Sequence, residues 1–338
     1  MKEPIILMGH GSGGRLTRDL IAKTFVSRFS NSFLNKLNDA AVFVSPGDKL
    51  AFTTDSFVID PIFFPGGNIG SLAVSGTVND LCVSGAIPKF LSLGLILEEG
   101  FPLDQLEKIS ESIRAEALKA NVEIVTGDTK VVKKGQCDKI FINTSGIGRV
   151  PEDRLHLGDI AAIVPGDKII ISGYLGDHAM TILAAREDLH FNDPLISDVA
   201  PLNNLAEAAL TDPADIRMMR DITRGGLATV LCEICERQKF GAELDEEQIP
   251  VRQSVQSVCG MYGFDPLYLA NEGKMVLIVR EDKEEKVLRA LQSVSQGKDA
   301  RIAGKVTAAH PGLVQIKTLI GGTRVIDMLS GEMLPRIC

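Results

Sequence analysis

The chain has 338 residues, of which 45% are hydrophobic, so it is long enough for two domains with their own cores. Its net charge is −8, only 5% of its residues are aromatic, and it contains no Trp. Such a chain lacks both the positive charge that binds a phosphate backbone and the aromatic surfaces on which bases stack, so we do not expect nucleic acid as a partner.

The amino-terminal apolar run is too short for the core of a secretion signal, and no stretch reaches transmembrane length. The six cysteines are scattered, which is typical of reduced thiols. These features predict a cytoplasmic protein with no membrane partner. Cys232 and Cys235 form a CxxC pair, but the apolar residues around them recur at helical spacing and no further zinc ligands match. We expect both in a buried helix.

Apolar runs that alternate with helical patterns predict an α/β or α+β fold. The predicted strands lie at 49–59, 89–99, 139–148, 167–173 and 274–281. Residues 101–121 open with Pro102 and place apolar side chains on one face, which predicts an amphipathic helix on a sheet. Residues 174–186 predict a helix that starts after a glycine.

Pro, Gly and Asp cluster after residue 147, so we place a domain boundary near residue 150. The first domain then spans 1–150 and the second spans 151–326. Residues 327–338 show neither a helical nor a strand period and contain Pro335. We therefore expect a mobile tail that ends in Cys338.

Three aspartates, Asp39, Asp55 and Asp128, are predicted where a strand gives way to a loop or helix. Asp80 lies in a predicted helix rich in small residues. If these carboxylates converge, they make an oxygen-rich site for Mg²⁺, which in turn binds ATP phosphates. Each aspartate alone is more often a helix cap or a solvated turn residue, so only the set predicts a site.

Two glycine-rich stretches, residues 9–14 and Gly225–Gly226, precede predicted helices. Backbone amides at a helix start can bind phosphate, but paired glycines also permit tight packing, and the sequence leaves both interpretations open. No pair of histidines has zinc-site spacing. His10, in the first glycine stretch, is the histidine to test, although an ordinary loop histidine is the commoner case.

Lys134 belongs to a lysine cluster that follows Asp128, and it is either a cation that balances a transferring phosphoryl group or part of a solvated charge run. Glu272 lies between Asn271 and Gly273 at the entry to an apolar strand. That setting suits a catalytic carboxylate and, more often, an ordinary loop residue.

Seven motifs occur in the order GSGG, NDAAV, TTDSFV, GTVNDLCVSGA, TGDTKVV, DITRGGL and ANEGK. This series resembles the superfamily of aminoimidazole ribonucleotide synthetase, formylglycinamidine synthetase, thiamine monophosphate kinase and selenophosphate synthetase over nearly the whole chain. Within it, HGSGGRLTRDLI and the terminal LPRIC are similar to the hydrogenase maturation proteins that make the cyanide ligands of the nickel-iron centre. The early glycine loop lacks the reactive cysteine of selenophosphate synthetases, which disfavours that branch.

The resemblance implies a two-domain PurM-like fold, in which the N-terminal domains of a homodimer form a shared β-barrel and the C-terminal domain is α+β. It also implies that a carbamoyltransferase partner loads a carbamoyl group onto Cys338. ATP then drives dehydration of the thiocarboxamide to a thiocyanate, and a hydrogenase maturation scaffold complex receives the cyanide.

The resemblance assigns roles to residues at matching positions. Mg²⁺ and ATP are held by Asp39, Asp55, Asp80 and Asp128, with nucleotide contacts from Thr77 and Asn79. Cys338 carries the substrate, Lys134 stabilises phosphoryl charge, and Glu272 takes a proton from the carboxamide, although a water or an aspartate can serve as the base instead. Directly before Asp39, this chain has Asn38 where related proteins often have an aspartate, so the number of metal ions is open.

Two other functions compete with this one. The chain could be an ATP-dependent synthetase or kinase that acts on a free small substrate, in which case Cys338 would be dispensable. It could also be a non-catalytic ATP-binding scaffold for maturation proteins, in which case the tail would be a docking peptide.

Overall fold

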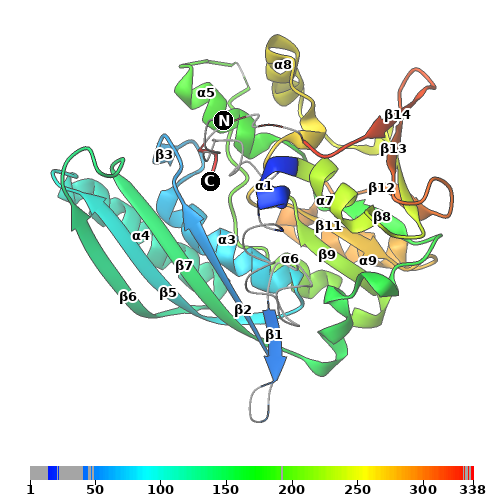
Figure 1. Cartoon of the computed structure of the whole chain (residues 1–338), viewed down its shortest axis with the longest axis horizontal. Coiled ribbons are helices and arrows are strands. Elements are labelled where there is room, and N and C mark those ends of the chain that lie inside the picture. The colour runs from blue at the N-terminus through cyan, green and yellow to red at the C-terminus, as the bar shows by residue number, and fades with distance from the viewer. Residues whose placement is uncertain are drawn as a thin grey trace, which may run out of the picture.

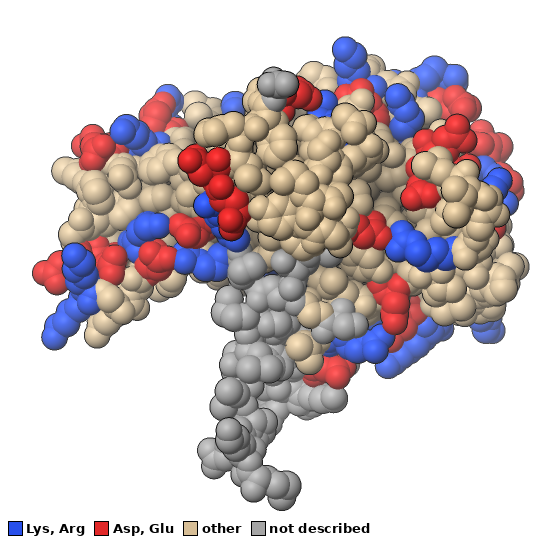
Figure 2. Space-filling view, turned by 90° about the horizontal axis from the view of Figure 1, so that it is seen from above, with Lys and Arg blue, Asp and Glu red and all other residues tan. Residues whose placement is uncertain are grey.

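The computed structural model describes residues 14–20, 22, 41–44, 47, 49–191, 193–329, 331, 334 and 336–338. They form two parts, each built on one large sheet, with the helix α3 between the sheets (Figure 1). Within these ranges, no helix combines the length and the apolar character needed to cross a bilayer. On the face shown in Figure 2, Lys and Arg are interspersed with Asp and Glu, and the centre is largely uncharged.

The first sheet has five strands in the order β1-β2-β7-β5-β6. They are β1 (Ala41–Val44), β2 (Lys49–Phe57), β5 (Ile87–Glu98), β6 (Glu123–Val132) and β7 (Ile140–Val150). Buried and exposed residues alternate along β2 and β7. One face of the sheet therefore packs on α3 and the other is exposed. A short hairpin of β3 (Phe63–Phe64) and β4 (Gly67–Asn68) leads into α3.

Helix α3 (Ile69–Val83) is buried on all sides, because its many small residues let both parts of the protein approach it. Asn68 caps its first turn, where its side chain accepts hydrogen bonds from the backbone amides of Gly70 and Ser71. Asp80 is the one residue of this helix that is not buried. The helix α4 (Leu103–Ala120) packs beside α3.

The second sheet has seven strands in the order β14-β13-β10-β12-β8-β11-β9. They are β8 (Lys168–Ile171), β9 (Ile216–Asp221), β10 (Gly241–Asp245), β11 (Met275–Val279), β12 (Arg301–Thr307), β13 (Val314–Lys317) and β14 (Thr323–Ile326). The helices of this part are α5 (Asp177–Arg186), α6 (Asn203–Ala209), α7 (Gly226–Cys235), α8 (Gln253–Tyr262) and α9 (Glu284–Gln292). The first sheet ends at Val150 and the second begins at Lys168.

Short 3₁₀ helices connect several of these elements. They lie at Glu152–Gly158, Ile160–Ala162, Pro213–Asp215, Glu246–Gln248, Pro266–Tyr268 and Ser295–Gly297. Near the amino terminus, α1 (Arg15–Leu20) lies against the segment that follows β14. The backbone amide of Arg15 donates to the carbonyl oxygen of Leu329 at 2.8 Å, and its guanidinium pairs with Asp327 at 3.0 Å.

The helix predicted over 101–121 is confirmed as α4, with Pro102 at its N-cap. It ends at Asn121, which adopts the left-handed conformation with φ 54°. The prediction that an aspartate marks the end of a strand was wrong for Asp55 and Asp128, because both lie inside strands, β2 and β6. Strand β6 tolerates polar residues because it is the edge of its sheet and is exposed along its length.

The CxxC pair lies in a buried helix, as predicted. Cys232 and Cys235 belong to α7 and are 8% and 1% exposed. Burial raises the pKa of each thiol to about 12. Neither sulfur is therefore a ready thiolate for a metal or for redox exchange.

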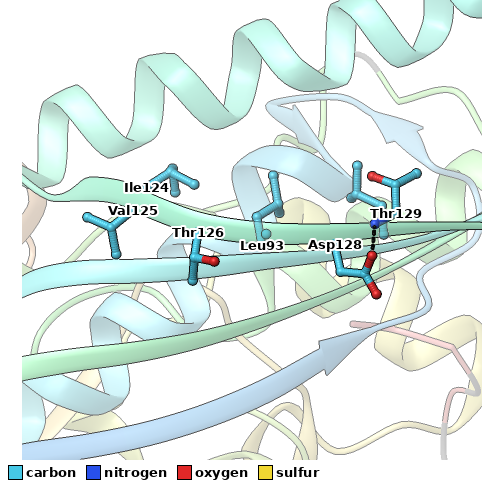
Figure 3. A pocket seen from close by; sticks show the side chains of 8 residues that line it. Leu93, Ile124, Val125, Thr126, Asp128 and Thr129 are labelled. Carbon is cyan, nitrogen blue, oxygen red and sulfur yellow. Dashed lines mark hydrogen bonds between the residues drawn. The ribbon is translucent and has the colours of Figure 1, made fainter.

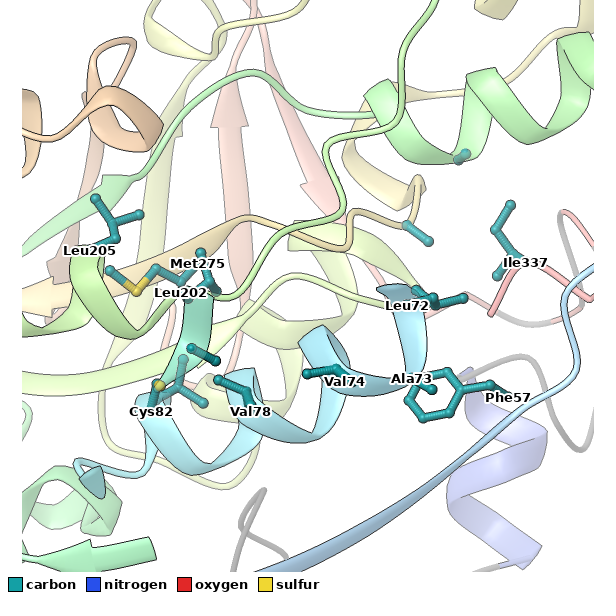
Figure 4. Packing of buried hydrophobic residues seen from close by; sticks show 14 of the residues in the cluster. Phe57, Leu72, Ala73, Val74, Val78, Cys82, Leu202, Leu205, Met275 and Ile337 are labelled. Carbon is teal, nitrogen blue, oxygen red and sulfur yellow. The ribbon is translucent and has the colours of Figure 1, made fainter. Parts of the chain in front are cut away.

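One hydrophobic cluster joins the two parts of the protein. Val74 and Val78 of α3 face Leu202 and Met275 of the second part, as Figure 4 shows. Ile337, near the end of the chain, lies at the same cluster. The two sheets and the carboxyl terminus are thus held around a shared core.

Candidate active site

The carboxyl terminus lies in a charged, largely buried cluster where the two parts of the protein meet. The electrostatic neighbours of the Cys338 thiol are Arg224, Glu272 and Asp55. Arg224 also interacts with Asp80. Two carboxylates and one guanidinium are therefore neighbours of the terminal cysteine, and Asp80 joins the cluster through Arg224.

Each charged group reaches the cluster from a different element. Asp55 lies on the buried face of β2, and Asp80 projects from α3. Arg224 lies in the loop between β9 and α7, and Glu272 lies in the loop before β11. The hydroxyl of Thr53 donates to Asp80 Oδ2 at 2.8 Å, which orients that carboxylate.

Glu272 is buried, with 3% of its surface exposed. Burial raises its pKa well above the usual range, and the nearby carboxylates of Asp198 and Asp55 raise it further. Among the described residues, its Oε1 has no hydrogen-bond partner. A buried carboxyl with a high pKa and a free oxygen is suited to exchange a proton with a bound substrate.

The loop that carries Glu272 is held by Asp198. The carboxylate of Asp198 accepts hydrogen bonds from the backbone amides of Glu272 at 3.2 Å and Gly273 at 3.1 Å. Lys274 pairs with the same carboxylate at 3.1 Å. The backbone around the candidate base is therefore fixed by buried, charge-assisted hydrogen bonds.

Cys338 itself keeps some exposure, but its thiol is removed from water. Burial raises the pKa of the thiol to about 12; Arg224 lowers it, and Glu272 and Asp55 raise it. Asp55 has a raised pKa as well, again through burial, with Arg224 and the amide of Ser56 acting in the opposite direction. In the docked position the cysteine is therefore a neutral thiol.

The structure assigns Asn79 a contact that the sequence did not predict. Its amide nitrogen donates to the carbonyl oxygens of Glu272 at 3.1 Å and Ala200 at 3.2 Å, and its oxygen accepts from Leu202. Thr77 is fully buried and shares a hydrogen bond with Thr144. Both side chains are engaged within the chain, so their contact with a nucleotide stays a prediction.

Asp128 is not brought together with Asp55 and Asp80 within one chain. Across the sheet, Asp55 of β2 lies opposite Thr144 of β7, which lies opposite Leu93 of β5, which lies opposite Gly127 of β6. Asp128 is one residue later than Gly127, so its side chain projects from the other face of the sheet than that of Asp55. The backbones of β2 and β6 are three strand spacings apart, about 14 Å.

The surroundings of Asp128 are exposed. It lines an open groove along β5 and β6, and its carboxylate points away from α4 (Figure 3). Lys130 pairs with it at 2.8 Å and lowers its pKa. Lys134 lies beyond the end of β6 and is exposed. Asp128 and Lys134 can therefore act at the cluster around Cys338 only if a second chain or a conformational change brings them there.

The described residues provide an incomplete metal site. Asp55 and Asp80 offer the carboxylate oxygens that Mg²⁺ binds, but no group of three or more His, Cys, Asp or Glu in the described ranges is placed to hold a metal ion. Asp39, the remaining predicted ligand, lies outside the described residues, as do His10 and most of the first glycine stretch. The carboxylates present fit part of a magnesium ligand set.

Sequence reasoning missed two site residues. Arg224 belongs to the DITRGGL motif, whose glycines have positive φ angles of 80° and 64° and leave no room for a side chain. The Cβ of a residue at Gly226 would lie 2.3 Å from the carbonyl oxygen of Leu267, which supports tight packing. His178 contacts the tail at the carbonyl of Ile337, a role that the sequence did not indicate.

The last residues are packed, whereas the sequence predicted a mobile tail without packing. The backbone amides of Val58 and Asp60 donate to the carbonyls of Cys338 and Arg336, at 3.0 and 3.3 Å. Ile337 is only 5% exposed. The difference arises from the burial of Ile337 and from these backbone hydrogen bonds. The sequence pattern of residues 327–338 does not predict either contact, because it has no helical or strand period.

Comparison with known proteins identifies the family. Residues 37–150 match the N-terminal domain, and residues 164–317 the C-terminal domain, of AIR synthase related proteins. The carbamoyl dehydratase HypE of Azotobacter vinelandii is 48% identical over 98% of this chain and 96% of its own length.

Two solved structures are also similar over most of the chain. A HypE–HypF complex superposes with a TM-score of 0.85 at 47% identity, covering 92% of this chain and 99% of the other. The hydrogenase maturation protein HypE in complex with ATP has a TM-score of 0.82 at 47% identity, covering 99% of this chain and all of the other. With both domain models matched and near-complete coverage at this identity, the chain belongs to the HypE family of AIR synthase related proteins.

Proposed function

We propose that this protein is an ATP-dependent carbamoyl dehydratase whose substrate is a carboxamide on its own Cys338. The product would be a thiocyanate, which supplies cyanide for assembly of a nickel-iron hydrogenase centre. The observation that carries the proposal is the position of the Cys338 thiol beside Glu272 and Arg224. The relatives named carbamoyl dehydratase, and the one solved with ATP, support it.

The reaction needs a better leaving group than hydroxide. The carboxamide oxygen attacks the γ-phosphorus of ATP, ADP departs, and one N–H proton is lost. The C–O bond then breaks with release of phosphate while the second N–H proton leaves, which forms the C≡N bond. The net change is the loss of one water from the carboxamide, with its oxygen in the phosphate.

The chain supplies a base and a cation for these steps. Ionised Glu272 takes a proton from the carboxamide nitrogen in this proposal, and burial, which raises its pKa, makes it a stronger base than an exposed glutamate. The guanidinium of Arg224 lies among the carboxylates and balances the negative charge that develops near the sulfur. Mg²⁺ would neutralise phosphate charge when bound, with Asp55, Asp80 and Asp39 as the ligands offered by one chain.

The docked tail must leave the cluster to be loaded. We infer that residues 327–338 swing out to a carbamoyltransferase, for which the HypE–HypF complex of a relative is the model, and return with the carboxamide. A second partner, the hydrogenase maturation complex, then takes the cyanide. This exchange of thiol chemistry suits the cytoplasm, where the six free cysteines would stay reduced.

We propose a homodimer in which the exposed face of the first sheet and the edge strand β6 meet a second copy. Strand β6 is exposed on both faces, and Val125 and Val131 are 55% and 66% exposed. Such an edge is an unusual surface for a monomer. A second chain against it would give Asp128 and Lys134 new neighbours.

Charged substitution at this edge should weaken the dimer. Val131→Lys is expected to shift the protein toward monomer by placing a charge in the interface, as measured by light scattering during gel filtration. Val164→Lys, at an exposed valine outside the first sheet, is the control and should leave the mass unchanged. A monomeric wild type would contradict the dimer.

The two aspartates test the nucleotide site. We expect Asp80→Asn to lower ATP turnover by about 10- to 100-fold, because it removes a charged contact without changing size. Asp128→Asn should have a similar effect, because the proposed dimer brings its face of the sheet to the nucleotide. Unchanged ATP hydrolysis in both variants would exclude the site, and an effect of Asp80→Asn alone would exclude the dimer contribution.

The decisive test of function follows the mass of the tail. Mild cyanate treatment carbamoylates thiols, and the protein is then given Mg-ATP and analysed by intact and peptide mass spectrometry. In the wild type, the terminal peptide should lose the mass of one water only when ATP is present. Cys338→Ala should show no such change.

An adduct that persists while ATP is bound would exclude self-dehydration. A free substrate or a scaffold role would then remain, and the two differ in ATP turnover. A synthetase or kinase would hydrolyse ATP with its own small substrate after loss of Cys338, whereas a scaffold would bind ATP without turnover.

A further inference from the structure

The docked tail is bound in the manner of an added strand. The carbonyls of Arg336 and Cys338 accept hydrogen bonds from the amides of Asp60 and Val58, directly after β2. The pairing of 336 with 60 and of 338 with 58 is antiparallel and skips one residue, as in a β-ladder. Recognition of a peptide by strand addition takes its affinity from such backbone hydrogen bonds.

The other edge of the tail is held by His178. Its Nε2 donates to the carbonyl oxygen of Ile337 at 2.7 Å, and its Nδ1 lies 2.7 Å from the hydroxyl of Ser197. The ring is fully buried, and burial lowers its pKa, so the neutral form with a proton on Nε2 is present at neutral pH. Ser197 fixes this tautomer by donating to Nδ1.

Two side chains of the tail are also recognised. Ile337 inserts into the shared hydrophobic cluster near Leu72 and Phe57, as Figure 4 shows. The guanidinium of Arg336 forms an ion pair with Asp138 and donates to the carbonyl of Val58 at 2.9 Å.

Arg186 adds a further clamp on the backbone. It donates to the carbonyl oxygens of Arg336 and Asp60, so it links the tail to the segment that the tail pairs with. None of the contacts described here uses the sulfur of Cys338. These contacts involve the backbone of the tail and the side chains of Arg336 and Ile337, the two residues that precede the cysteine.

We propose that these residues form a binding site for peptides that end in Arg-Ile-Cys, and that the peptide need not belong to the same chain. The site, here called the tail cradle, comprises Val58, Asp60, Asp138, His178 and Arg186. A carbamoylated peptide of this class would be bound and dehydrated in trans. The binding step stands alone, and the dehydration step rests on the proposed function.

The test uses the full chain with its own tail displaced. Ile337→Asp would bury a carboxylate among apolar groups, so this tail is expected to leave the cradle. A fluorescent synthetic peptide with the sequence GEMLPRIC is then added, and binding is followed by anisotropy. Ile337→Asp should bind the peptide, whereas the wild type, whose own tail occupies the cradle, should bind it far more weakly.

Two controls establish that the cradle is the site. Adding His178→Ala to Ile337→Asp should weaken binding by about tenfold or more, because the carbonyl of the peptide isoleucine loses its buried donor. His178→Gln, whose amide can donate, should restore part of it. A peptide with Asp in place of Ile should not bind; equal binding of both peptides, or no binding to Ile337→Asp with an unchanged circular dichroism spectrum, would overturn the proposal.

The second measurement separates this proposal from the proposed function. The carbamoylated peptide is given to Ile337→Asp with Mg-ATP, and its loss of one water is followed by mass. If the loaded wild type dehydrates its own tail but the peptide does not bind, the cradle proposal fails and the function stands. If the peptide binds yet neither it nor the wild-type tail is dehydrated, the function fails and the cradle stands.

Discussion

Glu272→Gln is expected to lower the rate of carboxamide dehydration by about 10²- to 10⁴-fold, the usual contribution of a positioned general base. The glutamine keeps the shape of the buried side chain but cannot take a proton. The backbone contacts from Asp198 and Asn79 do not involve the carboxyl, so they should persist. The rate is measured as ATP-dependent loss of water from the loaded tail.

Glu116→Gln is the matched control. Glu116 is another buried glutamate, but it lies on α4 and pairs with Lys119 at 2.7 Å, away from Cys338. The dehydration rate of Glu116→Gln should equal that of the wild type, and thermal melting should show that Glu116→Gln and Glu272→Gln are both folded. A Glu272→Gln enzyme within a few-fold of the wild type would mean that a water or an aspartate is the base.

Release of the tail is expected to raise the reactivity of Cys338 toward iodoacetamide by up to about 1000-fold near pH 8, because only the thiolate reacts. Burial raises the pKa of the docked thiol from 9.0 to about 12, which lowers its thiolate fraction by that factor. Ile337→Asp and His178→Ala should both release the tail. The alkylation rate is read from the terminal peptide by mass spectrometry, so that Cys137, which is partly exposed, does not interfere.

The pH dependence has a definite sign. Because the docked thiol has the higher pKa, docking is favoured while the thiol is protonated and weakens as the pH rises from about 9 toward 12. Wild-type alkylation should therefore rise more steeply with pH than that of Ile337→Asp in this range. Equal rates for both proteins at pH 8 would contradict a docked resting state.

Much of the local structure could be predicted from patterns along the chain. The helix over 101–121 and the buried strand after Glu272 follow from the spacing of apolar residues, which reports which faces are covered. The motif order was sufficient to indicate the family. The positions of the aspartates were harder to predict, because a polar residue inside an exposed edge strand, such as Asp128, resembles the end of a strand in the sequence pattern.

Arg224 and His178 could not be predicted as site residues for a related reason. They lie in DITRGGL and GDHAM, and nothing in those stretches distinguishes a polar side chain that faces the tail from a solvated one. Their partners in the tail, Ile337 for His178 and Cys338 for Arg224, are more than 100 residues away in the chain. Only the packing of the second part against α3 brings them together.

The amino-acid sequence by itself determined the alternation of strands and helices, the family motifs and the terminal cysteine, because these depend on residue type and short-range spacing. The tertiary structure alone decided that Asp55 and Asp80 share a cluster with Glu272 while Asp128 faces the other side of the sheet. It also decided that the tail docks. Both outcomes depend on strand register and on burial between distant segments, which the spacing of residues along one chain does not specify.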